Sequence, residues 1–301
     1  MKIQSLSIVV PTHNKCVNSC KFCVSRTHTN PYPDRINKTA KEYIKYSKAY
    51  NPISVELECK DYFNRLQFAR DNGCNVIVLT GTGEPIQNMD FIEFFSRVNS
   101  TLTTPFKSIE VQTTGVMLND ENLKELRNLG ITTISFSISN IFDNDRNLEL
   151  IGCNDKLRFN VFETIGLIKK YDFNLRLSLN LVNDYDNYTV EQVIVRCKEL
   201  GADQVTFRKL YKSELNNDID KWIEENASTK FYDELVEYVK KNGKFLGILP
   251  FGPSIYDIEE MSMVVDDDCM SQDAVDTYKY VILRENCKLY TNWMTKASLV
   301  F

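Results

Sequence analysis

The alternation of short β-rich runs with helical patterns constrains the fold of this chain more than any other feature of its sequence. Strands that are covered by helices on a face give nearly continuous apolar runs. Six runs have the length and composition of such strands, at residues 5–10, 75–80, 108–113, 132–138, 174–181 and 204–210. The pattern therefore predicts an α/β fold built from βα units around a parallel sheet.

Helical spacing of apolar residues occupies the intervals between these strands, in stripes at residues 62–69, 123–129, 157–168 and 190–200. Gly73, Gly130 and Gly201 follow three of the stripes, where glycine can end a helix in the left-handed conformation. The alternation ends near residue 210. We therefore expect an alternating α/β region over residues 1–210 and a C-terminal α+β extension over residues 211–301.

The extension has its own pattern of elements. It predicts a charged helix at residues 218–241, a strand at 245–249 and a closing hairpin made by 278–283 and 288–291. A further segment, residues 26–53, interrupts the first βα unit with a turn-rich stretch at 30–34 and a helical pattern at 38–50. This insertion is expected near the loop that follows the first strand.

Composition excludes several classes of protein. Hydrophobic residues make up 43% and charged residues 26% of the 301 residues, as in a soluble globular protein with a large core. The net charge of -5 disfavours nucleic acid as a partner. There is no signal-peptide pattern and no apolar run long enough to span a membrane, so a cytoplasmic location is expected. Nine cysteines, of which three are clustered, suit a reducing compartment better than a disulfide framework.

The clustered cysteines, Cys16, Cys20 and Cys23, share one short loop after the first strand. Thiolates hold iron–sulfur clusters, and a cubane with three protein ligands keeps one iron open to another ligand. A zinc site is the alternative, with His13 or His28 as the fourth ligand, although closed zinc sites usually pair cysteines in two separated knuckles. A non-catalytic metal-binding or electron-transfer protein would use the three cysteines with such an outside ligand.

A second motif, Gly81-Thr82-Gly83-Glu84-Pro85, follows the second predicted strand. Glycine lets the backbone approach a ligand, and exposed backbone polar groups can meet an ammonium group. Both motifs follow strands, so they should meet at the carboxyl edge of the sheet, where α/β folds place their chemistry.

These two motifs, with the aromatic Phe22 before the last cysteine, resemble the signatures of the radical S-adenosylmethionine (radical SAM) superfamily. The resemblance covers roughly residues 3–210 and implies a partial (βα)6 TIM-like barrel with a 4Fe–4S cluster on Cys16, Cys20 and Cys23. Thr82 stands where the superfamily usually has glycine. The fifth strand lacks the glycine-containing adenine motif of some members. The implied S-adenosylmethionine-binding residues are Phe22, Thr82, Gly83, Glu84, Pro85, Thr114, Ser137, Asn180 and Arg208.

For two of these residues, Asn180 and Arg208, the sequence leaves the surroundings of the side chain open. Asn180 lies inside an apolar strand, so its amide needs a partner if it is buried. Arg208 could clamp a carboxylate or a phosphate, or it could be a solvated charge at a strand end.

In such enzymes one electron from the cluster cleaves S-adenosylmethionine, and the resulting 5'-deoxyadenosyl radical abstracts hydrogen from a substrate. The resemblance thus implies a small-molecule or peptide substrate and an external one-electron donor such as flavodoxin or ferredoxin. It implies no catalytic residue beyond the cluster and the cofactor. An activase that installs a glycyl radical on a partner protein is the alternative within the superfamily.

The closing hairpin is loosely similar to the terminal region of molybdenum-cofactor-cyclase-type members. Where members with auxiliary clusters have cysteine, this chain has Trp293, and Cys269 and Cys287 do not form a multi-cysteine array. One cluster is therefore expected. The remaining cysteines fall within or beside expected elements and should behave as small core residues, namely Cys59, Cys74, Cys153 and Cys197.

Overall fold

The computed structural model describes residues 2–12, 16–27, 60–213, 215–249, 253–266 and 277–300. Several sequence-based expectations lie outside these residues. They are the helical pattern at 38–50, the histidines His13 and His28, and the cysteines Cys59 and Cys269.

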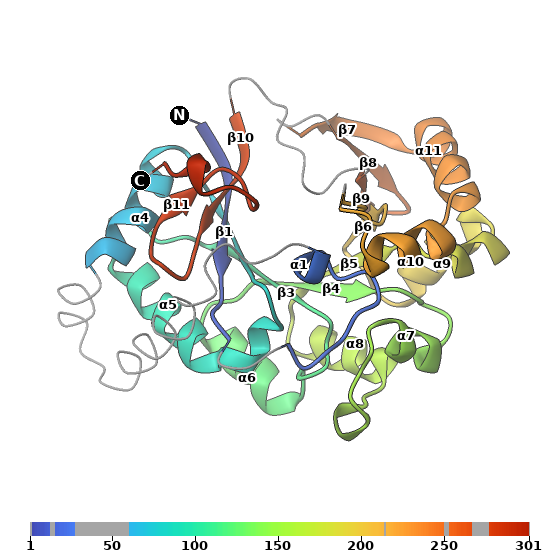
Figure 1. Ribbon diagram of the computed structural model, residues 1–301, viewed down its shortest axis with the longest axis horizontal. Helices are drawn as coiled ribbons and strands as arrows, with labels where there is room; N and C mark the ends of the chain where they lie inside the picture. Colours follow the sequence, from blue (N-terminus) through green and yellow to red (C-terminus); the bar gives the residue numbers. More distant parts are fainter. Residues whose placement is uncertain are drawn as a thin grey trace.

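Six parallel strands in sequential order form the central part of the sheet (Figure 1). Each overlaps one of the six runs expected from the sequence, which confirms the α/β prediction. The strands are β1 (Lys2–Val9), β2 (Val76–Thr80), β3 (Ser108–Thr113), β4 (Thr133–Ile138), β5 (Asn174–Asn180) and β6 (Gln204–Arg208).

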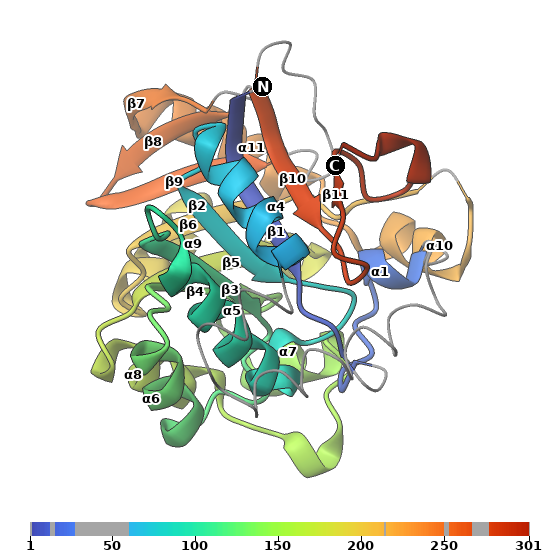
Figure 2. The same ribbon diagram turned by 90° about the vertical axis from the view of Figure 1, so that its left-hand side faces the viewer.

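Helices connect these strands and cover the outer face of the sheet (Figures 1 and 2). Four of them lie on the predicted apolar stripes: α4 (Lys60–Asp71), α6 (Asp120–Asn128), α8 (Val161–Lys170) and α9 (Val190–Glu199). Three further helices of the described residues were not predicted: the short α1 (Val24–Thr27), α5 (Met89–Thr101) and α7 (Asn144–Leu150). Gly73, Gly130 and Gly201 have φ values of +86°, +85° and +73°, as expected for glycines that end helices.

Strands from the C-terminal region extend the sheet on both sides. β10 (Thr277–Leu283) pairs in parallel with β1, and β9 (Met261–Asp266) pairs in parallel with β6. The sheet has the order β11-β10-β1-β2-β3-β4-β5-β6-β9-β8-β7 and is open. Its remaining strands pair antiparallel and are β7 (Lys244–Ile248), β8 (Ser254–Ile258) and β11 (Leu289–Tyr290). The predicted strand at 245–249 and the closing hairpin are thus confirmed.

The charged helix predicted at residues 218–241 is two helices, α10 (Asp218–Asn226) and α11 (Lys230–Asn242). The break follows from bonds to the barrel. Ser228 donates its N–H to the carbonyl of Leu181 at 3.0 Å, and the carboxylate of Asp186 accepts from the Ser228 hydroxyl at 2.6 Å and from the Phe231 N–H at 2.9 Å. These bonds draw the backbone out of the helical path.

The two faces of the central sheet differ in polarity. Outward side chains such as Leu6, Ile77 and Val111 are fully buried under the helices in one large hydrophobic core. The inner face instead carries polar side chains, as at Glu110 and Gln112, because successive strand residues point to opposite faces. The barrel interior therefore carries polar side chains beside apolar ones such as Val76 and Val78. No helix of the described residues is long and apolar enough to cross a membrane.

Candidate functional site

The three clustered cysteines lie on the loop that leaves the carboxyl end of β1, and their thiols are free and partly buried. Burial raises the pKa of the Cys16 thiol, and the nearby charges of Glu84 and Cys23 add to the shift. Burial also raises the pKa of the Cys20 thiol, with added contributions from Cys23 and Cys16. The charges of the three cysteines affect one another's pKa, which indicates that the loop brings their sulfur atoms close together. A bound cation would lower these pKa values and deprotonate the thiols.

This donor set fits an iron–sulfur cluster, because thiolates are its usual protein ligands. Within the described residues, no three His, Cys, Asp or Glu side chains form a group able to share one metal ion. In a cubane cluster, by contrast, each cysteine ligates a different iron. The histidines of the zinc alternative lie outside the described residues.

One side of the cysteine loop is fixed by the segment that follows β2. The backbone N–H of Val17 donates to Oε1 of Gln87 at 3.1 Å. Just before the loop, the Asn88 amide donates to the Pro11 carbonyl at 2.6 Å. Asn18 donates through Nδ2 to the hydroxyl of Thr114 at 2.7 Å. The Oδ1 atom of Asn18 is buried without a partner, so a ligand at the cysteine loop could donate to it.

The other side of the loop rests on the end of α7. The Ser19 N–H donates to the carbonyls of Ile151 and Gly152, both at 3.2 Å, and the Lys21 N–H donates to the Leu150 carbonyl at 3.1 Å. Gly152 has φ +56°, and a Cβ atom there would lie 2.3 Å from Oγ of Ser19. Only glycine allows this close approach.

Glu84 joins the second motif to the third strand. Its buried carboxylate accepts from the Thr114 N–H at 3.0 Å and from the Thr114 hydroxyl at 2.8 Å. Burial raises the pKa of Glu84, while the hydrogen bonds from Thr114 oppose that shift. Because the same hydroxyl also accepts from Asn18, Thr114 connects the two motifs that the sequence analysis singled out.

The glycines of the second motif have a packing role. A Cβ atom on Gly81 would lie 3.0 Å from the Val10 carbonyl oxygen, and one on Gly83 would lie 3.0 Å from Cγ2 of Thr12. Glycine at both positions therefore lets this loop lie against the chain that leads to the cysteines. Pro85 begins the short 3₁₀ helix η1 (Pro85–Asn88), for which Glu84 is the N-cap.

Three of the remaining residues expected to contact the cofactor, Ser137, Asn180 and Arg208, lie apart from these motifs, whereas Phe22 is part of the cysteine loop. The amide of Asn180, which the sequence predicted to need a partner, donates to the hydroxyls of Ser137 at 3.1 Å and Ser139 at 3.3 Å. Arg208 is the backbone partner of Asn180 on β6. Phe22 packs toward Trp222 of α10, with ring centroids 6.1 Å apart.

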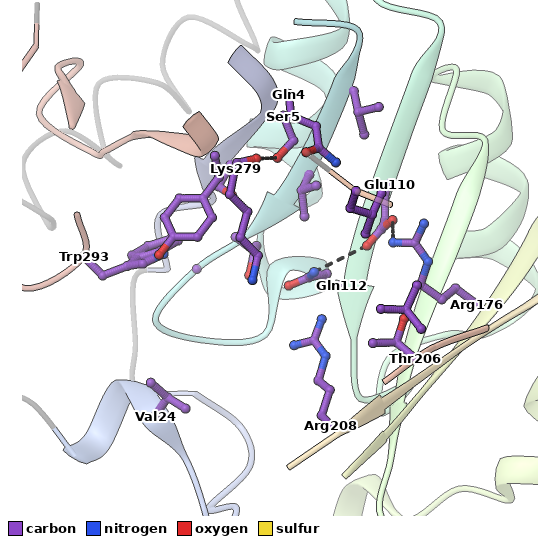
Figure 3. A pocket seen from close by; sticks show the side chains of 18 of the residues that line it. Gln4, Ser5, Val24, Glu110, Gln112, Arg176, Thr206, Arg208, Lys279 and Trp293 are labelled. Carbon is purple, nitrogen blue, oxygen red and sulfur yellow. Dashed lines mark hydrogen bonds and ion pairs between the residues drawn. The ribbon is translucent and has the colours of Figure 1, made fainter. Parts of the chain in front are cut away.

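A cavity of about 530 Å³ lies inside the barrel, beside the cysteine loop (Figure 3). It reaches from Val24, the residue after Cys23, past Gly81 and Thr82 to polar side chains on the inner faces of β3, β5 and β6. Figure 3 shows Glu110 of β3 paired with Arg176 of β5, across the intervening strand β4, and Gln112 donates to Glu110 at 3.4 Å. Arg176 also donates through Nε to Gln204 at 2.8 Å.

Sequence reasoning missed these interior residues, although a signal was present. Glu110, Gln112 and Arg176 interrupt apolar strands at positions that share one face. Polar residues at alternate positions of otherwise buried strands indicate a polar interior, as the structure shows.

A fold and a site of this kind match one family. The model of the radical SAM superfamily matches residues 10–188, so this chain belongs to the radical SAM superfamily. The superfamily uses a 4Fe–4S cluster and S-adenosylmethionine. A search of curated protein sequences gave no match.

Solved structures with a similar fold include three radical SAM proteins. SuiB of Streptococcus suis, bound to the precursor peptide SuiA, has a TM-score of 0.57 and 12% identity over 96% of this chain and 59% of SuiB. The structure of anSMEcpe with bound AdoMet has a TM-score of 0.55 and 14% identity, over 97% of this chain and 75% of anSMEcpe. Coproporphyrinogen III oxidase (HemN) of Escherichia coli has a TM-score of 0.53 and 13% identity, over 82% of this chain and 55% of HemN. This chain thus spans about three fifths of the length of SuiB, and the likeness establishes the partial TIM barrel.

Proposed function

We propose that this protein is an enzyme that cleaves S-adenosylmethionine reductively and uses the 5'-deoxyadenosyl radical to abstract hydrogen from a small-molecule or peptide substrate. The cluster, on Cys16, Cys20 and Cys23, supplies the electron for that cleavage when it is bound. The observation that carries the proposal is the hydrogen-bonded link from Asn18 through Thr114 to Glu84, which holds both motifs at one edge of the barrel.

The roles of the protein residues follow from their positions. The cysteine loop is anchored on both sides, so its thiols are presented in a fixed arrangement before any ligand binds. We assign the cofactor to the same edge of the sheet and infer that it contacts residues of the second motif and the ends of β3, β4 and β5. The candidates are Thr82, Gly83, Glu84, Pro85, Thr114, Ser137 and Asn180.

The barrel cavity is the proposed substrate site. Its volume of about 530 Å³ falls in the range of small-molecule pockets. Enclosure by the barrel wall would keep water from a reactive intermediate. Two of the similar structures hold peptides, SuiA in SuiB and Cp18Cys in anSMEcpe, which supports a peptide as one of the two substrate classes.

The proposed reaction also needs an external one-electron donor such as flavodoxin or ferredoxin. The seven cysteines that lie in the described residues are all free. This agrees with work in a reducing compartment, and we propose the cytoplasm.

The experiment that tests the function is a cleavage assay without oxygen. The protein is reconstituted with iron and sulfide, mixed with S-adenosylmethionine and dithionite, and assayed for 5'-deoxyadenosine by chromatography. We expect product from the intact protein and none from the Cys20→Ala variant. A protein with an intact cluster by electron paramagnetic resonance that yields no 5'-deoxyadenosine would contradict the proposal.

A further inference from the structure

The wall of the barrel cavity is basic, although the whole chain has a net charge of -5. Among the described residues that line it, four side chains are basic and one, Glu110, is acidic. The basic ones are Arg176, Arg208, Lys279 and Arg284. A cavity of one predominant sign attracts ligands of the opposite sign, because its low-dielectric walls focus the field.

Two of the arginines have clear structural partners. Arg176 forms an ion pair with Glu110, whose side chain is 4% exposed. The guanidinium of Arg284 lies over the rings of Tyr290 and Trp293, at 5.7 Å and 5.4 Å from their centroids. The charges of Arg176 and Arg284 are therefore used within the protein.

Arg208 has neither an ion pair nor a ring contact of this kind in the part of the chain that the structure describes. Its Nε atom, like that of Arg284, is buried without a hydrogen-bond partner. Figure 3 shows its guanidinium inside the cavity, on the side of Gln112. Arg208 is half-buried, and its guanidinium lines the cavity. A carboxylate or phosphate in the cavity could accept charge-assisted hydrogen bonds from it there.

The position of Arg208 favours the substrate over the cofactor as the source of that anion. Arg208 lines the cavity, as does Thr82 at its edge toward the second motif, whereas Thr114, Ser137 and Asn180 do not. Asn180, its neighbour on β5, donates from its amide to Ser137 of β4 and to Ser139 just after that strand. Arg208 thus faces the cavity that we assign to the substrate.

Another part of the wall is aromatic. Tyr280 and Trp293 both line the cavity, and their ring centroids are 6.3 Å apart. These rings offer an apolar surface to the part of a ligand that does not carry its charge.

We propose that the substrate carries a carboxylate or phosphate group, which Arg208 binds, and an apolar or aromatic portion that packs against Tyr280 and Trp293. This inference rests on the proposed function, since it assigns the cavity to the substrate. It narrows the substrate class to anionic molecules or acidic peptide residues. Arg208 is then a residue that determines specificity.

The test measures equilibrium binding to the full, reconstituted chain by anaerobic calorimetry, with phenyl phosphate, benzoate and the uncharged benzyl alcohol as probes. Arg208→Gln should weaken the two charged probes at least tenfold and leave benzyl alcohol unchanged. The matched control is Lys209→Gln, which removes the same charge from the next residue. Lys209 is exposed and lies 5.0 Å from the Tyr232 ring, so this change should have no effect.

Fluorescence locates the probes. The chain has two tryptophans, so Trp222→Phe leaves Trp293 on the cavity wall as the sole reporter. Phenyl phosphate should change its emission.

Two outcomes would overturn the inference: equal binding of charged and uncharged probes, or equal effects of the Arg208→Gln and Lys209→Gln changes. A parallel titration with S-adenosylmethionine separates the two sources of the anion. Its affinity should be the same for Arg208→Gln and the unchanged protein. If only this affinity falls, the anion is the cofactor's own carboxylate and the inference is wrong. This test measures binding and not cleavage, so a failure of this inference can be distinguished from a failure of the proposed function.

Discussion

At the scale of single residues, Thr114 has the largest number of roles in the candidate site. Its backbone and hydroxyl both donate to the buried carboxylate of Glu84, and the hydroxyl accepts from Asn18 of the cysteine loop. A buried carboxylate depends strongly on such donors, because few other groups can replace water around it.

The Thr114→Val variant removes this hydroxyl and keeps the side-chain shape. We expect a loss of about 1–3 kcal/mol in the free energy of unfolding, because one donor to Glu84 disappears. Urea denaturation measures the change. Thr114→Ser keeps the hydroxyl and should lose less, and equal losses in the two variants would show that the hydrogen bond is unimportant.

Cysteine substitutions test the ligand assignment. Cys20→Ala should abolish stable iron binding, whereas Cys197→Ala should leave the iron content unchanged, because Cys197 is a buried core residue of α9. Burial raises the pKa of its thiol to about 12, which keeps it protonated. Iron and sulfide analysis after reconstitution distinguishes the variants, and the reverse pattern would refute the assignment.

The sequence predicted these cysteines and the Gly83-Glu84-Pro85 segment because their signal is local spacing. It did not predict the Glu110–Arg176 pair, since these two residues are 66 positions apart and meet only through strand pairing. Nor could it choose between a solvated Arg208 and one that faces a cavity. In the structure Arg208 is half-buried at the cavity wall, beside β9, which pairs with β6 only in the folded sheet.

At the scale of elements, α7 is the platform for the cysteine loop. It was not predicted, because its seven residues are mostly polar and give too short a periodic pattern. Its end nevertheless supplies the carbonyls that hold Ser19 and Lys21. Helices with long apolar stripes, such as α9, were predicted because burial of one face determines both their sequence and their position.

Gly152→Ala tests this platform. A Cβ atom there would lie 2.7 Å from the Ser19 carbonyl oxygen, and the positive φ disfavours any side chain. We expect a loss of about 1–3 kcal/mol in the free energy of unfolding and a lower iron content after reconstitution. Gly166→Ala is the control, since Gly166 lies in α8 with nothing within 4 Å of its Cβ position. That change should be neutral or stabilise the helix by about 0.5–1 kcal/mol. Equal iron contents in the two variants would contradict the platform role.

The other end of α7 is held by an ion pair. Arg146 donates through Nε and Nη2 to both carboxylate oxygens of Asp184, at 2.8 Å and 3.1 Å. The Arg146 guanidinium lowers the pKa of Asp184 below its usual value. The pair therefore stabilises the folded state above the unfolded pKa of about 3.9, and this contribution is lost as the pH falls through that value toward the lower folded pKa.

Asp184→Asn should thus destabilise the protein by about 1–2 kcal/mol at pH 7, and the difference from the unchanged protein should shrink below about pH 4. Thermal unfolding across this pH range measures it. Glu149→Gln removes an exposed partner of the same guanidinium and should have less effect. A loss for Asp184→Asn that is independent of pH would exclude the ion pair as its cause.

At the scale of the whole molecule, the barrel and the C-terminal region share one sheet and one hydrophobic core. Val281 and Leu289 of the C-terminal hairpin belong to the same buried cluster as Leu6 of β1 and Val205 of β6. The sequence indicated the hairpin but not its partner. Hydrophobic patterns mark strands, whereas parallel pairing across nearly the whole chain depends on tertiary packing.

A shared core predicts cooperative unfolding, although the sequence suggested separate regions at 1–210 and 211–301. Heating should give one transition, with the same midpoint by circular dichroism at 222 nm and by tryptophan fluorescence. The two probes are independent, because both tryptophans, Trp222 and Trp293, lie in the C-terminal region. Two separate midpoints would show that the extension is an independent domain.

The pairing of β10 with β1 also affects biosynthesis. The first strand emerges from the ribosome long before β10, which completes the sheet on that side, has been translated. During that interval one edge of β1 has unpaired backbone groups, and such edges invite association with other nascent chains. Chaperone binding to the nascent polypeptide would cover this edge until β10 is made.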